Sequence, residues 1–465
     1  MIKVKKNASV NKSTANEKLD ITVGSLIGYT VGVLLAYCSL ILLFLGPLQE
    51  FAYQPLYVAN FNYLKAIIGG FLLIILVFFM PKTEKTPAAL FLWLVFLLMI
   101  VPRVVVFACR NDGLLYLGFT VSAFMTVLFV SLFMRASSLP RFVASKRNQV
   151  TIQKFALLVA ILLVVCTVGG LAVTQGIPTL RAFNFDETYE MRASVQLSSV
   201  LDFLSNALGT YVLPLIIAFF LASKRVKAAL VLSMAELSLF MWTSNKGWLF
   251  CIFLLWGFYL LTVRKCVSSA FITWMYGGIL ASLAIVLCLL EIDSEWAFSF
   301  FSLFVRRTIF IPSILGSYYF DFFQGHDWIL LQNTVLSFLT PMSNQYSIMS
   351  FQNQIGLEAF GTNSNWANTG LFGGEYAQFG PLSWFVIVFN LLLLIKVLDR
   401  ETINEGAHLF LTFTAVLFAE ILLNASSVRL MFSLTGVITM VLFLFFLSSF
   451  RLVNETHDSA GEPEK

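Results

Sequence analysis

The chain has 465 residues, of which 58% are hydrophobic and only 12% are charged, and its mean hydropathy is +0.85. Soluble domains carry about 25% charged residues, so this chain lacks the polar side chains that a water-facing surface needs. The composition excludes a soluble globular protein and predicts an all-α polytopic integral membrane protein. The net charge of +5 does not indicate nucleic-acid binding, because the basic residues lie in short loops rather than in one stripe.

Cysteine and histidine usage gives no sign of a metal site. The six cysteines include no CxxC pair, so neither a disulfide framework nor a zinc site is expected. The three histidines, His326, His408 and His457, are scattered, and no cofactor is expected. A polar basic tail precedes a first apolar run that is long enough to span and stay, which is not the pattern of a cleavable signal.

Twelve apolar runs can cross a bilayer as helices, which takes roughly 20 residues each. They divide the chain into a tail 1–21, nine helices within 22–290, a large loop 291–380, three helices within 381–450 and a tail 451–465. The short run 228–243 is kept separate from the next run, because a single helix would place Lys246 at mid-bilayer. The runs are 22–47, 62–80, 88–108, 114–134, 154–174, 199–222, 228–243, 248–263, 268–290, 381–398, 407–424 and 430–450.

The asymmetry of basic residues sets the expected orientation. Placing both termini in the cytoplasm puts most of the 30 basic residues on the cytoplasmic side. Loop 291–380 then lies outside, with 300–323 and 335–349 as candidate re-entrant or interfacial helices. The outward basic residues are Lys65, Arg103, Arg110, Arg181, Arg192, Lys246, Arg306, Arg307 and Arg429.

These outward cations can be interpreted in two ways. Each can be a snorkelling side chain at a helix end or a member of a local ion pair. As a set that faces one compartment, they indicate a shared site for an anion such as phosphate or pyrophosphate.

The outer segment GIPTLRAFNFDETYEMRAS places Arg181 and Arg192 on either side of Asp186 and Tyr189. It is either a solvated connector or a loop that offers arginines to phosphate and carboxylates to sugar hydroxyls. The segment TSNKGWLF, 243–250, offers the Lys246 ammonium to a phosphoryl oxygen, or is a topological break with a snorkelling lysine.

Arg306 and Arg307 lie in the aromatic stretch FVRRTIFIPS. Two planar guanidinium groups in one turn can clamp phosphate oxygens, although adjacent residues point about 100° apart on a helix. The alternative is an interfacial pair that contacts lipid headgroups. Pro312 is expected to weaken or kink any helix here.

The segment NTGLFGGEYAQFG combines glycines with Glu375, Tyr376 and Gln378, and Asn368 begins it. Glycines allow close backbone approach to a ligand, and Asn, Gln and Tyr side chains suit polyhydroxylated ligands. Glu375 is a candidate general base, and a cap at a helix entry is the alternative.

Four blocks together resemble the bacterial oligosaccharide repeat-unit polymerases (Wzy-type O-antigen or capsule polymerases): DETYEMR at 186–192, TSNKGWLF at 243–250, RRTIFIPSILGSYYFDFF at 306–323 and NSNWANTGLFGGEYAQFG at 363–380. The resemblance implies a membrane glycosyltransferase of the GT-C-like class with about a dozen helices and a large outer loop. It would transfer a growing glycan from undecaprenyl pyrophosphate to an incoming lipid-linked repeat at the outer face of the inner membrane. A chain-length regulator and membrane lipids are the other expected partners.

In the light of that resemblance, Arg306, Arg307, Lys246 and Arg192 are expected to hold the donor pyrophosphate. Glu375 or Asp186 would orient or deprotonate the acceptor hydroxyl, and Tyr189, Tyr376, Gln378 and Asn368 would contact the glycan. An O-antigen ligase-like enzyme would share the donor and the clamp. A lipid-linked oligosaccharide flippase or other transporter would instead need charges at mid-membrane, and here Asp202 and Glu420 lie within apolar runs. A structural scaffold would leave the outward cations unexplained.

Overall fold

A computed structural model of the chain describes residues 23–82, 86–110, 114–134, 146–178, 182, 195, 197–264, 267–290, 294–332, 334–339, 351–361, 367–399 and 405–459. Within these ranges the structure is built from helices joined by turns and extended segments, and it contains no β-strand. The predicted all-α architecture is therefore confirmed.

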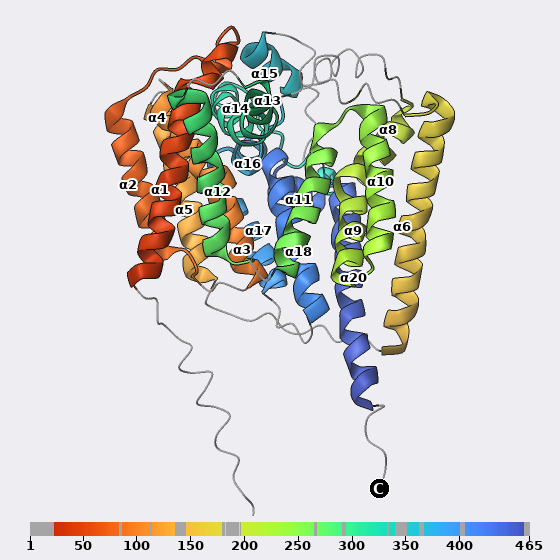
Figure 1. The fold of residues 1–465 in the computed structure, drawn as a ribbon. Helices are drawn as coiled ribbons and strands as arrows, with labels where there is room; N and C mark the ends of the chain where they lie inside the picture. Colours follow the sequence, from red (N-terminus) through yellow and green to blue (C-terminus); the bar gives the residue numbers. More distant parts are fainter. Residues whose placement is uncertain are drawn as a thin grey trace, which may run out of the picture.

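Each of the twelve predicted apolar runs coincides with a helix that runs along the bundle (Figure 1). Three of these helices contain a short π-helical segment, marked η. The helices are α1 (Val23–Leu45), α2 (Tyr63–Phe79), α3–η3–α4 (Pro87–Val95, Phe96–Ile100, Val101–Cys109), α5 (Leu114–Phe133), α6 (Lys146–Gln175), α8–η5–α9 (Ser199–Ala207, Leu208–Val212, Leu213–Ala222), α10 (Val226–Thr243), α11 (Lys246–Val263), α12–η6 (Ser269–Ala284, Ile285–Leu289), α17 (Ser383–Leu398), α18 (Glu405–Asn424) and α20 (Leu434–Ser459).

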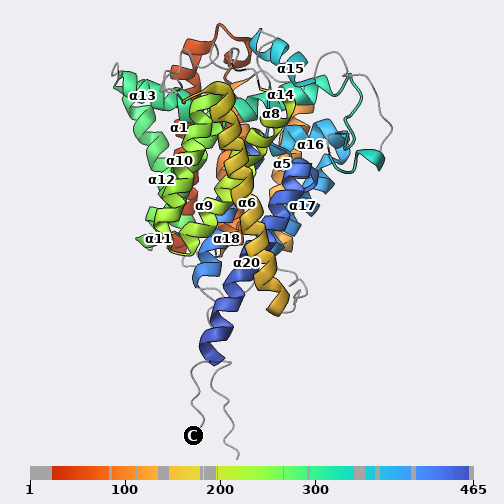
Figure 2. The same cartoon turned by 90° about the vertical axis from the view of Figure 1, so that its right-hand side faces the viewer.

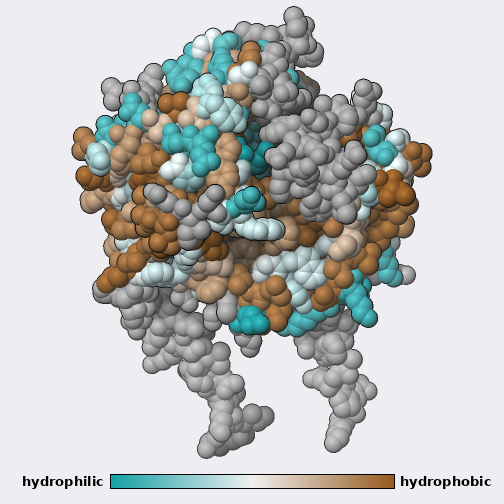
Figure 3. All heavy atoms as spheres, turned by 45° about the horizontal axis from the view of Figure 1, so that its top comes forward, coloured by the Kyte–Doolittle hydropathy of each residue, from teal (hydrophilic) through white to brown (hydrophobic). Residues whose placement is uncertain are grey.

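The helices have the length and surface of a membrane protein. Among the described residues, ten helices are long and apolar enough to cross a bilayer, and three shorter helices are also apolar. Hydrophobic residues cover the flanks of the molecule, and hydrophilic residues gather toward its two ends (Figure 3). The outer faces of α2 and α6 expose large apolar side chains at helical spacing, which suits contact with lipid. Exposed examples are Leu64, Ile67, Phe71, Phe78, Phe155, Leu158, Leu162 and Val165.

Two helices form the centre of the bundle. In the apolar windows of Pro87–Cys109 and Glu405–Asn424, 94% and 83% of the residues are buried, and the two helices pack against each other. Helices α1, α2, α5 and α12 surround the first, whereas α9, α11 and α20 pack on the second. Figure 1 shows these as two groups that stand side by side.

A long helix lies across one end of the bundle. It runs through α13 (Glu295–Phe300), η7 (Phe301–Phe310) and α14 (Ile311–Phe322). Figure 1 shows it nearly end-on and Figure 2 shows it lengthwise, perpendicular to the other helices. With α15 (Phe351–Phe360) and α16 (Leu371–Phe379) it forms what we call the cap, and its end of the bundle is the cap end. The expectation of a non-spanning helix over 300–323 agrees with this crosswise placement.

Prolines inside the long helices follow π-helical segments. Pro102, Pro214 and Pro312 each lie two residues beyond the end of η3, η5 or η7. A proline has no N–H group and its ring clashes with the carbonyl four residues earlier, and a widened π turn relieves both problems. Pro312 therefore lies within the crosswise helix without ending it, and the regular α-helical pattern is interrupted just before it by η7.

The alternation of helices brings the two ends of the described bundle, Val23 and Ser459, to the end opposite the cap (Figure 1). The same alternation places the described outward basic residues at the cap end: Lys65, Arg103, Arg110, Lys246, Arg306, Arg307 and Arg429. Arg181 and Arg192 lie outside the described residues.

The contact between α1 and α12 generates a stability prediction. A Cβ atom at Gly277 would lie 2.7 Å from the backbone oxygen of Gly32, whereas nothing lies within 4 Å of a Cβ at Gly278. We expect Gly277→Ala to lower the free energy of unfolding by about 1–3 kcal/mol through overpacking. Gly278→Ala is the matched control and should gain up to about 1 kcal/mol of helix propensity. Equal thermal unfolding midpoints for the two purified variants would contradict this packing.

Candidate functional site

The cap end joins two of the sequence blocks that are distant along the chain. The hydroxyl of Tyr319 in α14 donates to the carbonyl of Ala367 at 2.5 Å. The hydroxyl of Thr369 donates to the carbonyl of Pro312 at 3.1 Å. These two bonds fasten the segment before α16 along α14, so block 306–323 and the described part of block 363–380 form one unit.

Glycines let α16 approach its neighbours at backbone distance. A Cβ at Gly370 would lie 2.4 Å from the carbonyl oxygen of Leu423, at the end of α18. A Cβ at Gly373 would meet α14 at Gly316, and one at Gly374 would meet Ser426. The glycines that suggested close approach to a ligand therefore provide close approach to the protein's own backbone.

Glu375 holds the loop that follows α18. It is fully buried, and its Oε1 atom accepts hydrogen bonds from the Ser427 hydroxyl and from the Val428 N–H at 2.8 Å. Asn390 donates to the same Ser427 hydroxyl at 2.9 Å. Because these groups begin the short helix α19 (Ser427–Phe432), the carboxylate caps α19 rather than the helix that carries it. The carboxylate therefore lies inside the protein, where it accepts hydrogen bonds from the first residues of α19.

The helix that Glu375 caps presents an exposed cation at the cap end. Arg429 lies in α19, and its side chain is exposed although most of its neighbours in α19 are buried. It is close enough for its charge to act on the hydroxyl groups of Tyr319 in α14 and Tyr211 in η5. Arg429 is thus an exposed cation at the cap end whose charge reaches both the cap and the helix group that contains η5.

The adjacent arginines of the crosswise helix have different surroundings. The Arg306 guanidinium donates to the Ser302 hydroxyl at 3.0 and 3.2 Å and to the Tyr57 hydroxyl at 3.1 Å. It also lies 4.0 Å from the centre of the Phe51 ring. Arg306 therefore anchors the cap to the linker between α1 and α2, as a charge held by polar groups and aromatic rings. Arg307 is partly buried beside it in η7.

Lys246 is the first residue of α11 at the cap end and is partly buried. The Asn245 side chain caps this helix by accepting from Gly247 N–H. Two residues further on, Trp248 donates to Thr210 at 3.0 Å. The ring of Phe250 lies 5.7 Å from that of Phe304 in η7, so this block contacts the crosswise helix.

The candidate glycan contacts divide into buried and exposed residues. The Tyr376 ring is buried between Phe119 and Phe320. Gln378 is buried, and its Oε1 atom accepts a hydrogen bond from Leu331 N–H at 2.8 Å. This bond holds the segment around Leu331 against α16. Asn368 is exposed and is available to a ligand at the cap end.

Three predicted site residues, Asp186, Tyr189 and Arg192, lie outside the described residues. Two cations that the sequence placed in the outward set, but to which it gave no individual role, also lie at the cap end: Arg103 and Arg429. The signal for Arg103 was a charge inside an apolar run, and the signal for Arg429 was a charge between two runs. Neither signal distinguishes a ligand-binding arginine from a snorkelling one.

The contacts of Glu375 generate a second prediction. Glu375→Ala leaves the Val428 N–H and the Ser427 hydroxyl without their acceptor, and we expect it to cost about 1–3 kcal/mol of stability. Glu375→Gln keeps a carbonyl acceptor at that position and should lose clearly less. Thermal unfolding of the two purified variants measures the difference. Wild-type midpoints for both would reject the capping role. Loss of activity in a fully stable Glu375→Gln variant would support Glu375 as the general base.

Comparisons with known proteins complete the description of the site. A scan against protein-family models, a search of curated proteins and a search of solved structures find no match to this chain. The function is therefore inferred from the chemistry of the cap end.

Proposed function

We propose that the chain is a polymerase of undecaprenyl-pyrophosphate-linked oligosaccharide repeat units that works at the outer face of a bacterial inner membrane. One observation carries this proposal: basic residues from five separate parts of the chain lie at the same end of an apolar helical bundle. They come from α4, α11, η7, α19 and the start of α2. The positive-inside tendency disfavours cations on the outer side of a membrane, so their retention there needs a function.

The charge distribution suits a lipid-linked diphosphate. Cleavage of a glycosyl–pyrophosphate bond develops negative charge on the leaving group. Cations already placed at that position stabilise the transition state more than the ground state. The apolar flanks keep a polyprenyl chain in the bilayer while the cap end contacts its headgroup. Arg307, Lys246 and Arg429 are the residues proposed to contact the pyrophosphate.

The structure changes the expected division of roles within that group. Each of the three guanidinium nitrogens of Arg306 already donates a hydrogen bond, to Ser302 or to Tyr57. Arg306 is therefore proposed as an anchor of the cap rather than as a ligand of the pyrophosphate. Glu375 is buried beneath the site, so the acceptor hydroxyl is not proposed to lose its proton to it. Because pyrophosphate is a good leaving group, stabilisation of its charge supplies the main catalytic effect.

Two enzymes with this donor are distinguished by their products. A polymerase joins repeat units, so its loss leaves single-repeat glycans on the final acceptor. A ligase-like enzyme moves a finished glycan to another acceptor, so its loss leaves none attached. The cap-end cations fit both reactions, and the resemblance of the four blocks favours the polymerase.

A buried pair of carboxylates supports a second candidate, a transporter of lipid-linked oligosaccharides. Glu236 in α10 is fully buried, and neither carboxylate oxygen has a hydrogen-bond partner among the described residues. Glu420 in α18 is also buried, and it and Cys251 in α11 lie close enough to Glu236 to interact with it electrostatically. Carboxylates inside membrane helices are typical of proton relays in transporters.

The proposed polymerase activity is tested with a variant at an arginine of the cap end and a matched control variant. In a strain that lacks the chromosomal gene, Arg429→Ala should leave single-repeat glycans where the wild-type chain restores a long ladder on a gel. Loss of one charge-assisted contact predicts a rate lower by about 10²–10³. Lys224→Ala removes the same charge at the opposite end, in an exposed ion pair with Glu405, and should keep the ladder. A normal ladder with Arg429→Ala and Arg307→Ala would contradict the proposal.

The polymerase and the transporter predict different effects of a substitution at Glu236. For a polymerase, Glu236→Gln removes only a buried ionisable group, so ladder length should be unchanged and thermal stability equal or higher. If the chain is instead a transporter that relays protons through Glu236, the Glu236→Gln variant should fail to move its substrate, and lipid-linked glycan should accumulate on the cytoplasmic leaflet. Labelling of accessible glycan in intact inverted vesicles separates these outcomes.

A further inference from the structure

Arg103, in α4, is a buried cation with two guanidinium nitrogens that have no hydrogen-bond partner within the described part of the chain. Its side chain is 3% exposed, and its Nε and Nη1 atoms are buried with no hydrogen-bond partner among the described residues. No carboxylate within those residues forms an ion pair with it. An isolated buried charge costs several kcal/mol, so native proteins usually pair such a group.

The aromatic rings around Arg103 do not satisfy its donors. The guanidinium lies 4.4 Å from the centre of the Phe119 ring and 4.8 Å from that of Phe372. Cation–π contacts stabilise the charge, and they hold the plane of the group in place. These contacts do not supply conventional acceptors, so the Nε and Nη1 donors still lack hydrogen-bond partners among the described residues.

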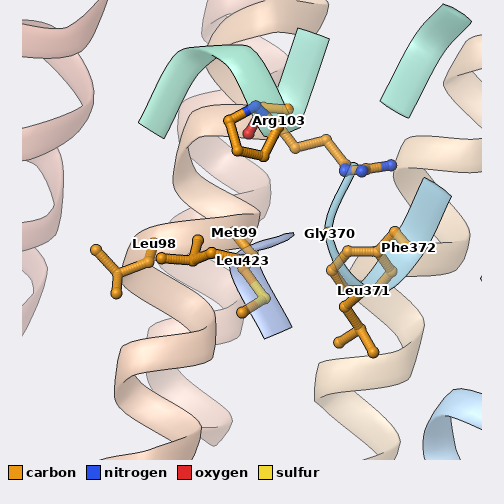
Figure 4. Close-up of a pocket in the computed structure, with 9 residues that line it drawn as sticks. Leu98, Met99, Arg103, Gly370, Leu371, Phe372 and Leu423 are labelled. Atoms are coloured by element: carbon orange, nitrogen blue, oxygen red, sulfur yellow. The ribbon is translucent and has the colours of Figure 1, made fainter. Parts of the chain in front are cut away.

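The open side of Arg103 faces a pocket that the first turn of α16 also lines. Figure 4 shows the guanidinium extending from α4 toward Phe372, with Gly370 and Leu371 beside it. Gly370 is the N-cap of α16, and no side chain caps that end. The first N–H groups of a helix lack intrahelical partners and carry partial positive charge. The cavity is about 10 Å³, which is the lower limit for one water-sized atom such as a single phosphate oxygen.

We propose that Arg103 and the N-terminus of α16 form a binding site for one oxygen of a phosphate group. The two features meet from different parts of the chain, and each supplies what an oxyanion needs: a planar fork of donors and a cluster of backbone N–H groups. The proposal rests on the proposed function for its ligand, which would be the pyrophosphate of the lipid carrier. In that case Arg103 positions the diphosphate below the cap.

The spacing on α14 supports a shared ligand. A Cβ at Gly316 would lie 2.7 Å from the Arg103 Nη2 atom, and Tyr319, near Arg429, follows one turn later on the same face of α14. Arg103 therefore packs against α14 at Gly316, and Arg429 acts electrostatically on the tyrosine one turn further along the same helix.

The site is tested by thermal unfolding of the full chain in a neutral detergent. Sodium pyrophosphate is compared with sodium chloride at the same ionic strength. A ligand that binds only the folded state raises the midpoint as its concentration rises. We expect pyrophosphate to raise the wild-type midpoint by on the order of 1–3 °C above the chloride reference.

The source of the phosphate is tested in nanodiscs. One set contains phosphatidylcholine alone, a second adds phosphatidylglycerol, and a third adds undecaprenyl phosphate. A rise of the midpoint confined to the third set supports the lipid carrier as ligand, and an equal rise in the second supports ordinary headgroups at the same site. No rise with pyrophosphate or with either anionic lipid overturns the site.

Three variants assign the effect to Arg103. Arg103→Met keeps the length of the side chain and removes an unpaired buried charge, so its midpoint without anion should equal or exceed that of the wild type, and the rise with pyrophosphate should disappear. Gly316→Ala intrudes on the guanidinium without changing the net charge and should reduce the rise. Arg110→Met is the matched control, because Arg110 already contacts the Leu56 carbonyl and the Tyr318 ring, and it should keep the rise.

An undiminished rise in Arg103→Met would overturn the proposal. The readout needs no turnover, so it is independent of the polymer assay. A chain that shows the Arg103-dependent rise but builds no polymer supports the anion site and contradicts the proposed polymerase. A chain that builds polymer without the rise supports the polymerase and overturns the anion site.

Discussion

The cap end depends on the close backbone contact between α16 and its neighbours. Gly370 and Gly374 let one face of α16 approach the end of α18 and the start of α19, while Gly373 lets the other approach α14. Glu375 then fixes α19 from within this contact. Larger residues at the glycine positions would separate α16 from α14 and from the start of α19, and so would displace the helix that carries Arg429. The site is therefore built from packing between short helices rather than from a flexible loop.

The cations at the cap end serve different purposes. Arg306, Arg110 and Lys65 have partners in helix ends, hydroxyl groups and aromatic rings, and they stabilise the junction of the cap with α2 and its linker. Arg103 is buried with open donors, and Arg429 is exposed next to buried tyrosines. A cation that lacks partners in a low-dielectric place is more informative about a ligand than one whose donors are already satisfied.

The crosswise helix explains how a membrane bundle can offer such a site. An apolar helix that lies across the end of the first helix group shields the space below it from bulk water, and electrostatic attraction is stronger where water is excluded. Its π-helical stretch allows Pro312 to lie within the helix without ending it, so one continuous element packs on α4, α5 and η6 and also reaches α11 through the contact of Phe304 with Phe250. The flanks stay apolar, which leaves a lipid-borne substrate access from the bilayer.

The sequence by itself determined the class of protein, the twelve helices and the alternation that gathers outward basic residues at one end, because composition, hydropathy and charge asymmetry act locally along the chain. It also identified the segments around Arg306 and Glu375 as parts of one region. Only the tertiary structure decided what those side chains contact: Arg306 binds Tyr57 from a distant linker, Glu375 caps α19, and Arg103 meets the start of α16. Burial and partner choice depend on which helices pack together, and that information is distributed over residues far apart in the chain.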